Sequence, residues 1–280
     1  MLRHLLAFEG RLLLRNGVFW IVLVVFGLFG FGMMVDDEIS FGGGVGNIMR
    51  NAPAVVITLL ATFGLLSVLL STIFVAGIAL RDFEQRTAEL FFATPMRKRD
   101  YLLGRFGGGF LASLAIMLVT ALGLWLGSLM PWLDQARLGP TPWAAYAWAF
   151  AVLVIPNLLF QAALLFMLAT LTRSMLYSYI GVIAFIVLWT MSGYLTRDLD
   201  SRWIGAMLDP SGLTAVSEHI RYWSSDQYNS QLPALTGLLL GNRLLWLGAT
   251  AAMLTAAFRL FRADREGIVL RRRKAGPAPA

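Results

Sequence analysis

The side chains with the most evident chemistry lie in one charged segment between two long apolar runs. Residues 81–105 combine arginine, lysine and acidic side chains with a short apolar cluster, Leu90-Phe91-Phe92. The charges would be costly inside a bilayer, so we expect the segment to lie outside it. The apolar cluster then has no soluble core of its own to enter. These residue types support non-covalent chemistry, and the pattern predicts docking to a soluble partner.

Sequence motifs for catalysis are missing from the chain. The glycine clusters at 41–46 and 104–109 lack the Gly-Lys-Ser/Thr ending of a phosphate-binding loop, and neither His-Glu-x-x-His nor Gly-x-Ser-x-Gly occurs. Cysteine is absent and His4 and His219 are the two histidines, so a metal site has few ligands to draw on. We therefore expect no catalytic residue, cofactor or metal in this chain. ATP hydrolysis, if the protein uses it, belongs to another subunit.

A few polar side chains interrupt the apolar runs. Asn157 and Gln161 lie one helical turn apart after Pro156, and they are candidates for a translocation path. The alternative is hydrogen bonding between helices, worth roughly 0.6 kcal/mol for each residue. Arg243 lies within the last run, and we expect it to extend outward or to pair with an acid of an outer loop. The runs contain no Asp, Glu, Lys or His, which argues against transport driven by protons.

The apolar runs that position these residues predict an all-α polytopic membrane protein. Hydrophobic residues make up 58% of the 280 positions and charged residues only 14%, against about a quarter charged in soluble domains. The runs are apolar on all sides and about twenty residues long, which favours helices over the alternating strands of a barrel. Six transmembrane helices are expected, at about 17–35, 54–80, 107–130, 143–171, 175–195 and 234–261.

The six spans form one domain over residues 17–261, and other segments precede, interrupt and follow them. Residues 1–16 read as an amphipathic interfacial helix, because a straight continuation into the first span would carry Glu9 and Arg11 towards lipid. A cytoplasmic segment at 81–105 and an outer loop at 196–233 separate spans within the domain. A basic cytoplasmic tail follows it at 262–280.

The positions of the basic residues predict the orientation. All but six of the 23 Lys and Arg residues would share one side with the N-terminus. This bias predicts that both termini are cytoplasmic. We expect the chain to lie in the cell's inner (plasma) membrane. The net charge of +7 then reflects topology, and we expect no nucleic-acid partner. The six exceptions are Arg50, Arg137, Arg197, Arg202, Arg221 and Arg243.

Glycines within the runs predict close contacts between helices. The pairs Gly123/Gly127 and Gly237/Gly241 have the spacing that lets two helix backbones approach each other. The cluster at 104–109 is expected to give a flexible entry to the third span with close helix packing.

The charged segment also carries a resemblance to a known family. The run Arg86-Thr-Ala-Glu-Leu-Phe-Phe-Ala-Thr-Pro-Met-Arg-Lys-Arg-Asp-Tyr-Leu-Leu-Gly-Arg105, placed after the second of six spans, resembles the ABC-2 type transporter permeases. It is similar to the family's Arg/Gly-Thr, Glu-Leu, Pro, Arg and Leu-Gly-Lys/Arg pattern, in which a cytoplasmic coupling helix docks on an ATP-binding subunit. The resemblance implies that the residues coupling to the ATPase are Arg86, Thr87, Glu89, Leu90, Phe91, Phe92 and Pro95.

A second run resembles one subgroup of that family. Leu208-Asp-Pro-Ser-Gly-Leu-Thr-Ala215, with Arg221-Tyr-Trp223 and Asn242-Arg-Leu-Leu-Trp246, is similar to permeases fused to an aminopeptidase domain of the M1 type. No peptidase motif occurs here, so the chain would be the membrane portion or a shorter relative. The resemblance also implies short helices in the outer loop at 196–233.

Together these features imply the membrane-spanning subunit of an ATP-driven transporter, an exporter that works as a dimer. The implied partners are an ATP-binding cassette subunit holding ATP and Mg, a second permease copy or a paralogue, and membrane lipid. The alternative from another class is a non-transporting membrane anchor or assembly subunit that recruits a soluble partner through the same segment. The substrate, and the choice between homodimer and heterodimer, stay open.

Overall fold

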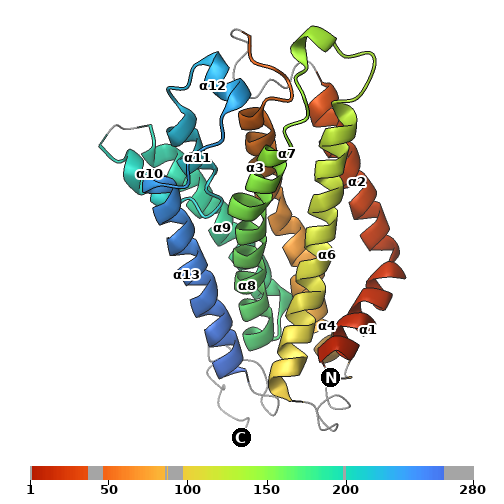
Figure 1. Cartoon of the computed structure of the whole chain (residues 1–280). Coiled ribbons are helices and arrows are strands. Elements are labelled where there is room, and N and C mark those ends of the chain that lie inside the picture. Colours follow the sequence, from red (N-terminus) through yellow and green to blue (C-terminus); the bar gives the residue numbers. More distant parts are fainter. Residues whose placement is uncertain (1, 37–46, 86, 88–96, 198–199, 262–280) are drawn as a thin grey trace, which may run out of the picture.

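The computed structural model describes residues 2–36, 47–85, 87, 97–197 and 200–261, and this part of the chain contains helices and no strand. Six helical stretches are long and apolar enough to cross a membrane, and they stand side by side in one bundle (Figure 1). The elements are α1 (Leu2–Leu14), α2 (Gly17–Val35), α3 (Pro53–Leu70), η1 (Ser71–Ala76), α4 (Gly77–Glu84), α6 (Lys98–Gly127), η2 (Gln135–Arg137), α7 (Trp143–Ala149), η3 (Phe150–Val154), α8 (Ile155–Thr172), α9 (Met175–Leu195), α10 (Arg202–Leu208), α11 (Leu213–Ile220), α12 (Ser225–Ser230) and α13 (Gly237–Leu260). The prediction of an all-α chain with six candidate spans is confirmed at this level.

The two ends of the bundle differ in character. One end, here called the basic end, holds α1, the end of α4, the start of α6, the turn between α8 and α9, and the end of α13 (Figure 1). The opposite end, here called the loop end, holds the three short helices α10, α11 and α12. The short helices expected in the outer loop are therefore present. Among the described residues, Arg3, Arg81, Lys98, Arg173 and Arg259, which were expected on one side, lie on elements of the basic end.

Two spans are longer than the sequence analysis expected. The stretch from α3 to α4 covers Pro53–Glu84, and α6 covers 30 residues from Lys98. At 1.5 Å per residue each is about 45 Å long, whereas the hydrocarbon core is about 30 Å thick. The segment predicted at 81–105 therefore begins inside α4, which ends at Glu84, and ends inside α6, which starts at Lys98. The predicted flexible entry at 104–109 is wrong, because these glycines lie inside a continuous α6.

Two wide helical turns interrupt the central spans. The π-helical turn η1 separates α3 from α4, and η3 lies just before Pro156 in the fourth span. Proline removes a backbone donor and clashes with the carbonyl four residues earlier in a regular helix, so a widened turn accommodates it. The fourth span therefore continues past Pro156 through a local widening of the helix.

Glycines bring α2 and α6 into backbone contact. Gly123 lies against the Gly27 carbonyl, Gly127 against Phe31 and Met34, and Gly30 against Thr120. The close approach predicted for Gly123 and Gly127 is confirmed. The other predicted pair does not act in this way: Gly237 faces open space, and Gly241 meets only the Met207 side chain.

Replacing Gly123 with Ala tests this contact. The new methyl group would meet the Gly27 backbone, and overpacking of this kind costs typically about 1–3 kcal/mol. We expect a lower midpoint of thermal unfolding in detergent. Gly32→Ala is the matched control, because Gly32 lies on α2 with no atom near the added methyl group, and it should leave the midpoint unchanged or raise it. Equal midpoints for the two variants would contradict the contact.

Candidate functional site at the basic end of the bundle

The first helix packs against α6 through the glycine cluster. Gly104 lies against Leu5, Gly107 against Leu6, and Gly108 against the Cβ and Cγ of Glu9. A side chain at these glycines would occupy the space that α1 fills. Figure 1 shows α1 meeting α2 at an angle and lying beside the lower part of α6. The glycine cluster therefore provides the surface that holds α1 against the bundle.

This packing brings Glu9 into a buried ion cluster with residues of α4 and α6. Glu9 Oε1 accepts hydrogen bonds from Arg105 Nη1 and from Arg81 Nη2, the latter at 2.6 Å. Arg105 Nη2 lies 2.5 Å from Asp82 Oδ2, which also accepts a 2.8 Å hydrogen bond from the Tyr101 hydroxyl. The residues Glu9, Arg81, Asp82, Tyr101 and Arg105 are called the buried ion cluster below.

Burial makes the ion cluster sensitive to the loss of any member. The side chains of Glu9, Asp82 and Arg105 are almost entirely shielded from solvent, and that of Arg81 is 20% exposed. Two carboxylates face two guanidinium groups, so the formal charges balance. Buried ion pairs give little net stability against an apolar alternative, yet removing one partner is strongly destabilising. The cluster therefore fixes the relative positions of α1, α4 and α6.

Aromatic contacts extend this packing to the other helices of the basic end. The rings of Tyr101 and Phe261 stack with centroids 6.2 Å apart, and Phe83 meets Phe261 edge to face at 6.3 Å. Lys98 Nζ donates a 2.5 Å hydrogen bond to the Phe261 carbonyl, so the start of α6 holds the end of α13. The Arg173 guanidinium, in the α8–α9 turn, lies 4.4 Å from the centre of the Phe83 ring. Movement of one of these helix ends would thus displace its neighbours.

The predicted coupling residues lie between the two helices that the ion cluster joins. Arg86, Glu89, Leu90, Phe91, Phe92 and Pro95 are outside the described residues. Thr87 is described, and its N–H donates a 2.9 Å hydrogen bond to the Asp82 carbonyl. Asp82 therefore takes part in the ion cluster through its side chain and contacts Thr87, just beyond α4, through its backbone carbonyl.

Asn157 and Gln161 lie inside the bundle with hydrogen-bond partners. Gln161 receives a hydrogen bond from the Ser67 hydroxyl at 2.7 Å and donates one to the Gly64 carbonyl at 2.8 Å, so it joins α8 to α3. Asn157 donates to the Ser211 carbonyl at 2.8 Å. Both side chains are fully buried. In this conformation they make the interhelical hydrogen bonds that were the alternative to a translocation path.

Arg243 lies buried beneath the short helices of the loop end. Its guanidinium donates a 2.8 Å hydrogen bond to Asn157 Oδ1 and contacts Asn242 Oδ1 and the Pro210 carbonyl. It also fills the position that a Cβ at Gly212 would take, and Gly212 has a φ of +72°. The expected outward extension is therefore wrong, because the 208–215 segment folds over Arg243 and supplies the Pro210 carbonyl as an acceptor. The other expectation, an acid of an outer loop as partner, fits Asp209, which is close enough to interact electrostatically with Arg243.

The Asp209 carboxylate holds the 208–215 segment in shape through hydrogen bonds to its neighbours in that segment. It accepts hydrogen bonds from the backbone N–H groups of Ser211 and Thr214 and from the Ser211 hydroxyl, at 2.6–2.8 Å. These bonds satisfy free donors at the start of α11. The motif at 208–215 thus serves as a structural cap over Arg243 in the described part of the chain.

Sequence reasoning missed the buried ion cluster. The sequence predicts an interfacial helix around Glu9 and a cytoplasmic segment around Arg105, and it does not indicate that the two side chains meet. One signal was available: an acid on a helix whose other residues are apolar or basic needs a cationic partner if that helix packs on the bundle.

Among the described residues, no group of three His, Asp or Glu side chains lies close enough to hold a metal ion.

Comparison of the chain with protein-family models, with curated proteins and with solved structures finds no match.

Proposed function

We propose that this chain is the membrane-spanning permease subunit of an ATP-driven ABC transporter, working as an exporter in the inner membrane with both termini in the cytoplasm. A separate ATP-binding subunit would hold ATP and Mg. It would dock on the connection between α4 and α6, through Arg86, Thr87, Glu89, Leu90, Phe91, Phe92 and Pro95. A second permease copy or paralogue would complete the assembly. The family resemblance of this run is the source of these assignments.

The observation that carries the proposal is the buried ion cluster. It joins α4 and α6, the two helices that flank the docking residues, and it adds α1 through Glu9. A force applied to the connection would therefore act on three helices together and not on one loop. Nucleotide can drive transport only if it favours one conformation of the spans over another. A rigid link between the docking segment and the spans is the feature that such a bias needs.

The same observation favours a transporter over a passive anchor. An anchor needs only a docking surface, and a loop tethered at its two ends would provide one. Here the docking segment is joined to the spans through shielded charges whose separation is costly. The rival reading of an anchor or assembly subunit predicts that ATP hydrolysis by the partner is dispensable for the phenotype of the protein.

The test is to place charges on the proposed docking residues. Phe91→Asp combined with Phe92→Asp should leave membrane insertion intact and abolish co-purification of the ATPase, because two carboxylates would have to enter an apolar groove. The measurement is the amount of ATPase recovered with the tagged chain in mild detergent.

The matched control is Trp203→Asp combined with Tyr222→Asp. These aromatic side chains are exposed at the loop end, so their replacement adds the same charge away from the proposed interface. Normal recovery of the ATPase with the Phe91/Phe92 variant would refute the docking assignment. Loss of the ATPase in both variants would show that the effect is not specific to the segment.

A further inference from the structure

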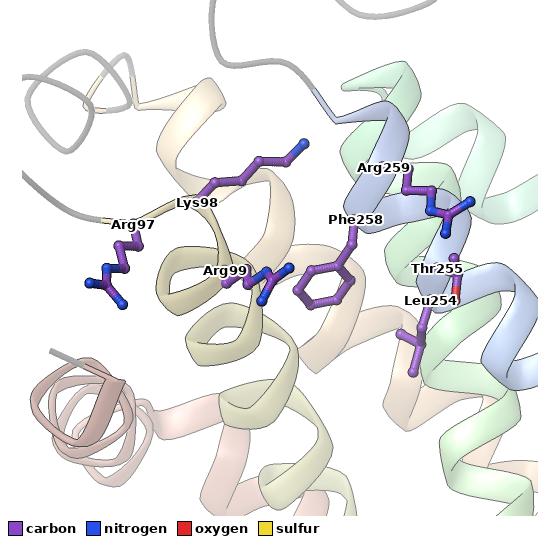
Figure 2. Close-up of a pocket in the computed structure, with 7 residues that line it drawn as sticks. All are labelled: Arg97, Lys98, Arg99, Leu254, Thr255, Phe258 and Arg259. Atoms are coloured by element: carbon purple, nitrogen blue, oxygen red, sulfur yellow. The ribbon is translucent and has the colours of Figure 1, made fainter.

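An open pocket lies between the start of α6 and the end of α13. It has a volume of about 650 Å³ and is lined by Arg97, Lys98, Arg99, Leu254, Thr255, Phe258 and Arg259. Figure 2 shows Arg99 directed towards the Phe258 ring, with Arg259 on α13 beyond it and Arg97 at the opposite margin. The pocket is open to its surroundings between the two helices.

The charged part of this lining is entirely cationic. Four of its side chains are basic and none is acidic. Lys98 Nζ is engaged by the Phe261 carbonyl, whereas Arg99 and Arg259 are exposed and have no ion pair or side-chain hydrogen bond within the described residues. Cations gathered in this way attract an anion that can neutralise them. The chemistry of the pocket therefore calls for a phosphate-bearing ligand.

The apolar part of the lining indicates which anion. Leu254 and Phe258 belong to α13, a candidate span of which only 22% of the most apolar stretch is buried in the bundle. The rest of that helix surface would face lipid tails. Arg259 lies in the last turn of α13 and Arg99 in the first turn of α6, so charge and apolar surface meet where a span ends. This is the level at which phospholipid headgroups join their acyl chains.

We infer that this pocket binds an anionic phospholipid from the leaflet at the basic end. The phosphate lies between Arg99 and Arg259, and an acyl chain runs along Leu254 and Phe258. A soluble protein partner fits less well, because the apolar wall of the pocket continues onto a lipid-facing helix. This inference requires only that the six helices span a membrane, so it stands whether or not the chain transports anything.

The test titrates the delipidated full-length chain with phosphatidylglycerol and with phosphatidylcholine of the same acyl chains, followed by native mass spectrometry. We expect phosphatidylglycerol to bind at least about tenfold more tightly. Arg99→Gln combined with Arg259→Gln should weaken phosphatidylglycerol binding by at least about tenfold and leave phosphatidylcholine binding unchanged. Phe258→Ser should also weaken the binding of phosphatidylglycerol. Soluble glycerol phosphate at the same concentration should not compete with phosphatidylglycerol for the pocket.

The matched control is Arg11→Gln combined with Arg15→Gln, which removes two exposed arginines of the basic end outside the pocket. It should keep the affinity of the parent chain to within about twofold. The inference is overturned if the two lipids bind equally, or if the control variant loses as much affinity as the pocket variant. It is also overturned if glycerol phosphate competes fully, which would indicate a site for a free anion. Thermal midpoints of both variants check that each is folded.

Discussion

Glu9→Gln is expected to lower the free energy of unfolding by about 3–5 kcal/mol and to release α1 from α6. The substitution keeps the size of the side chain and removes its charge. Two arginines, Arg81 and Arg105, would then share the single carboxylate of Asp82 in a site almost closed to solvent. The loss of one partner from a buried ion pair leaves an uncompensated charge, which is why the effect should be large.

Two measurements follow the two parts of this expectation. The midpoint of thermal unfolding in mild detergent should fall by roughly 5–10 °C. Release of α1 should speed tryptic cleavage after Arg11 and Arg15. Glu218→Gln is the matched control, because Glu218 forms a partly exposed ion pair with Arg221 at the loop end, and such pairs contribute about 0–1 kcal/mol. If Glu9→Gln behaved like Glu218→Gln, the cluster would not hold α1 in place.

Arg243→Met is expected to destabilise the loop end to a similar degree. The apolar chain of methionine would fill much of the space, but Asn157 Oδ1, Asn242 Oδ1 and the Pro210 carbonyl would lose their donor. Each buried acceptor left without a partner costs about 1–3 kcal/mol. The segment that folds over Arg243 should then loosen.

Thermal unfolding and hydrogen exchange of residues 205–216 provide the readouts for this second substitution. The midpoint should fall and exchange in that segment should accelerate. Arg137→Met is the control, since Arg137 is exposed at the same end of the bundle, and it should change neither quantity. An Arg243→Met protein with the parent's exchange rates would show that the segment is held by other contacts, such as the Asp209 cap.

The spans themselves could be predicted from the sequence because they depend on length and hydrophobicity alone. The first predicted span, 17–35, coincides with α2 (Gly17–Val35). The error at the start of the third span has a physical cause. Glycine lowers helix propensity by about 1 kcal/mol, so the 104–109 cluster argued against a helix. Packing of α1 on those glycines outweighs that preference, and α6 begins at Lys98.

The partners of buried charges could not be predicted in the same way. A sequence shows that Glu9 and Arg243 sit in apolar surroundings, but it does not show which helices meet. The pairing of Glu9 with Arg105 depends on how α1 folds back onto α6. The burial of Arg243 depends on the path of 208–215, which the sequence analysis placed in an outer loop. Glu9 lies within α1 (Leu2–Leu14) and Arg243 within α13 (Gly237–Leu260), and at both positions tertiary contacts rather than periodicity decide exposure.

The two polar regions suggest different roles. The ion cluster at the basic end joins helices that flank the proposed docking segment, so its geometry bears on how force is passed. The Arg243 region joins α8 and α13 to the short helices through Asn157, Asn242 and Pro210. It stabilises the loop end and contains no residue of the proposed docking segment.

Purification of the full-length chain from native membranes in mild detergent, with identification and quantification of every co-purifying protein, tests the central claim most directly. We predict a P-loop ATPase in equal stoichiometry with the chain, bound through residues 86–95. A purified complex that is active in the cell yet never contains a nucleotide hydrolase would contradict the proposal.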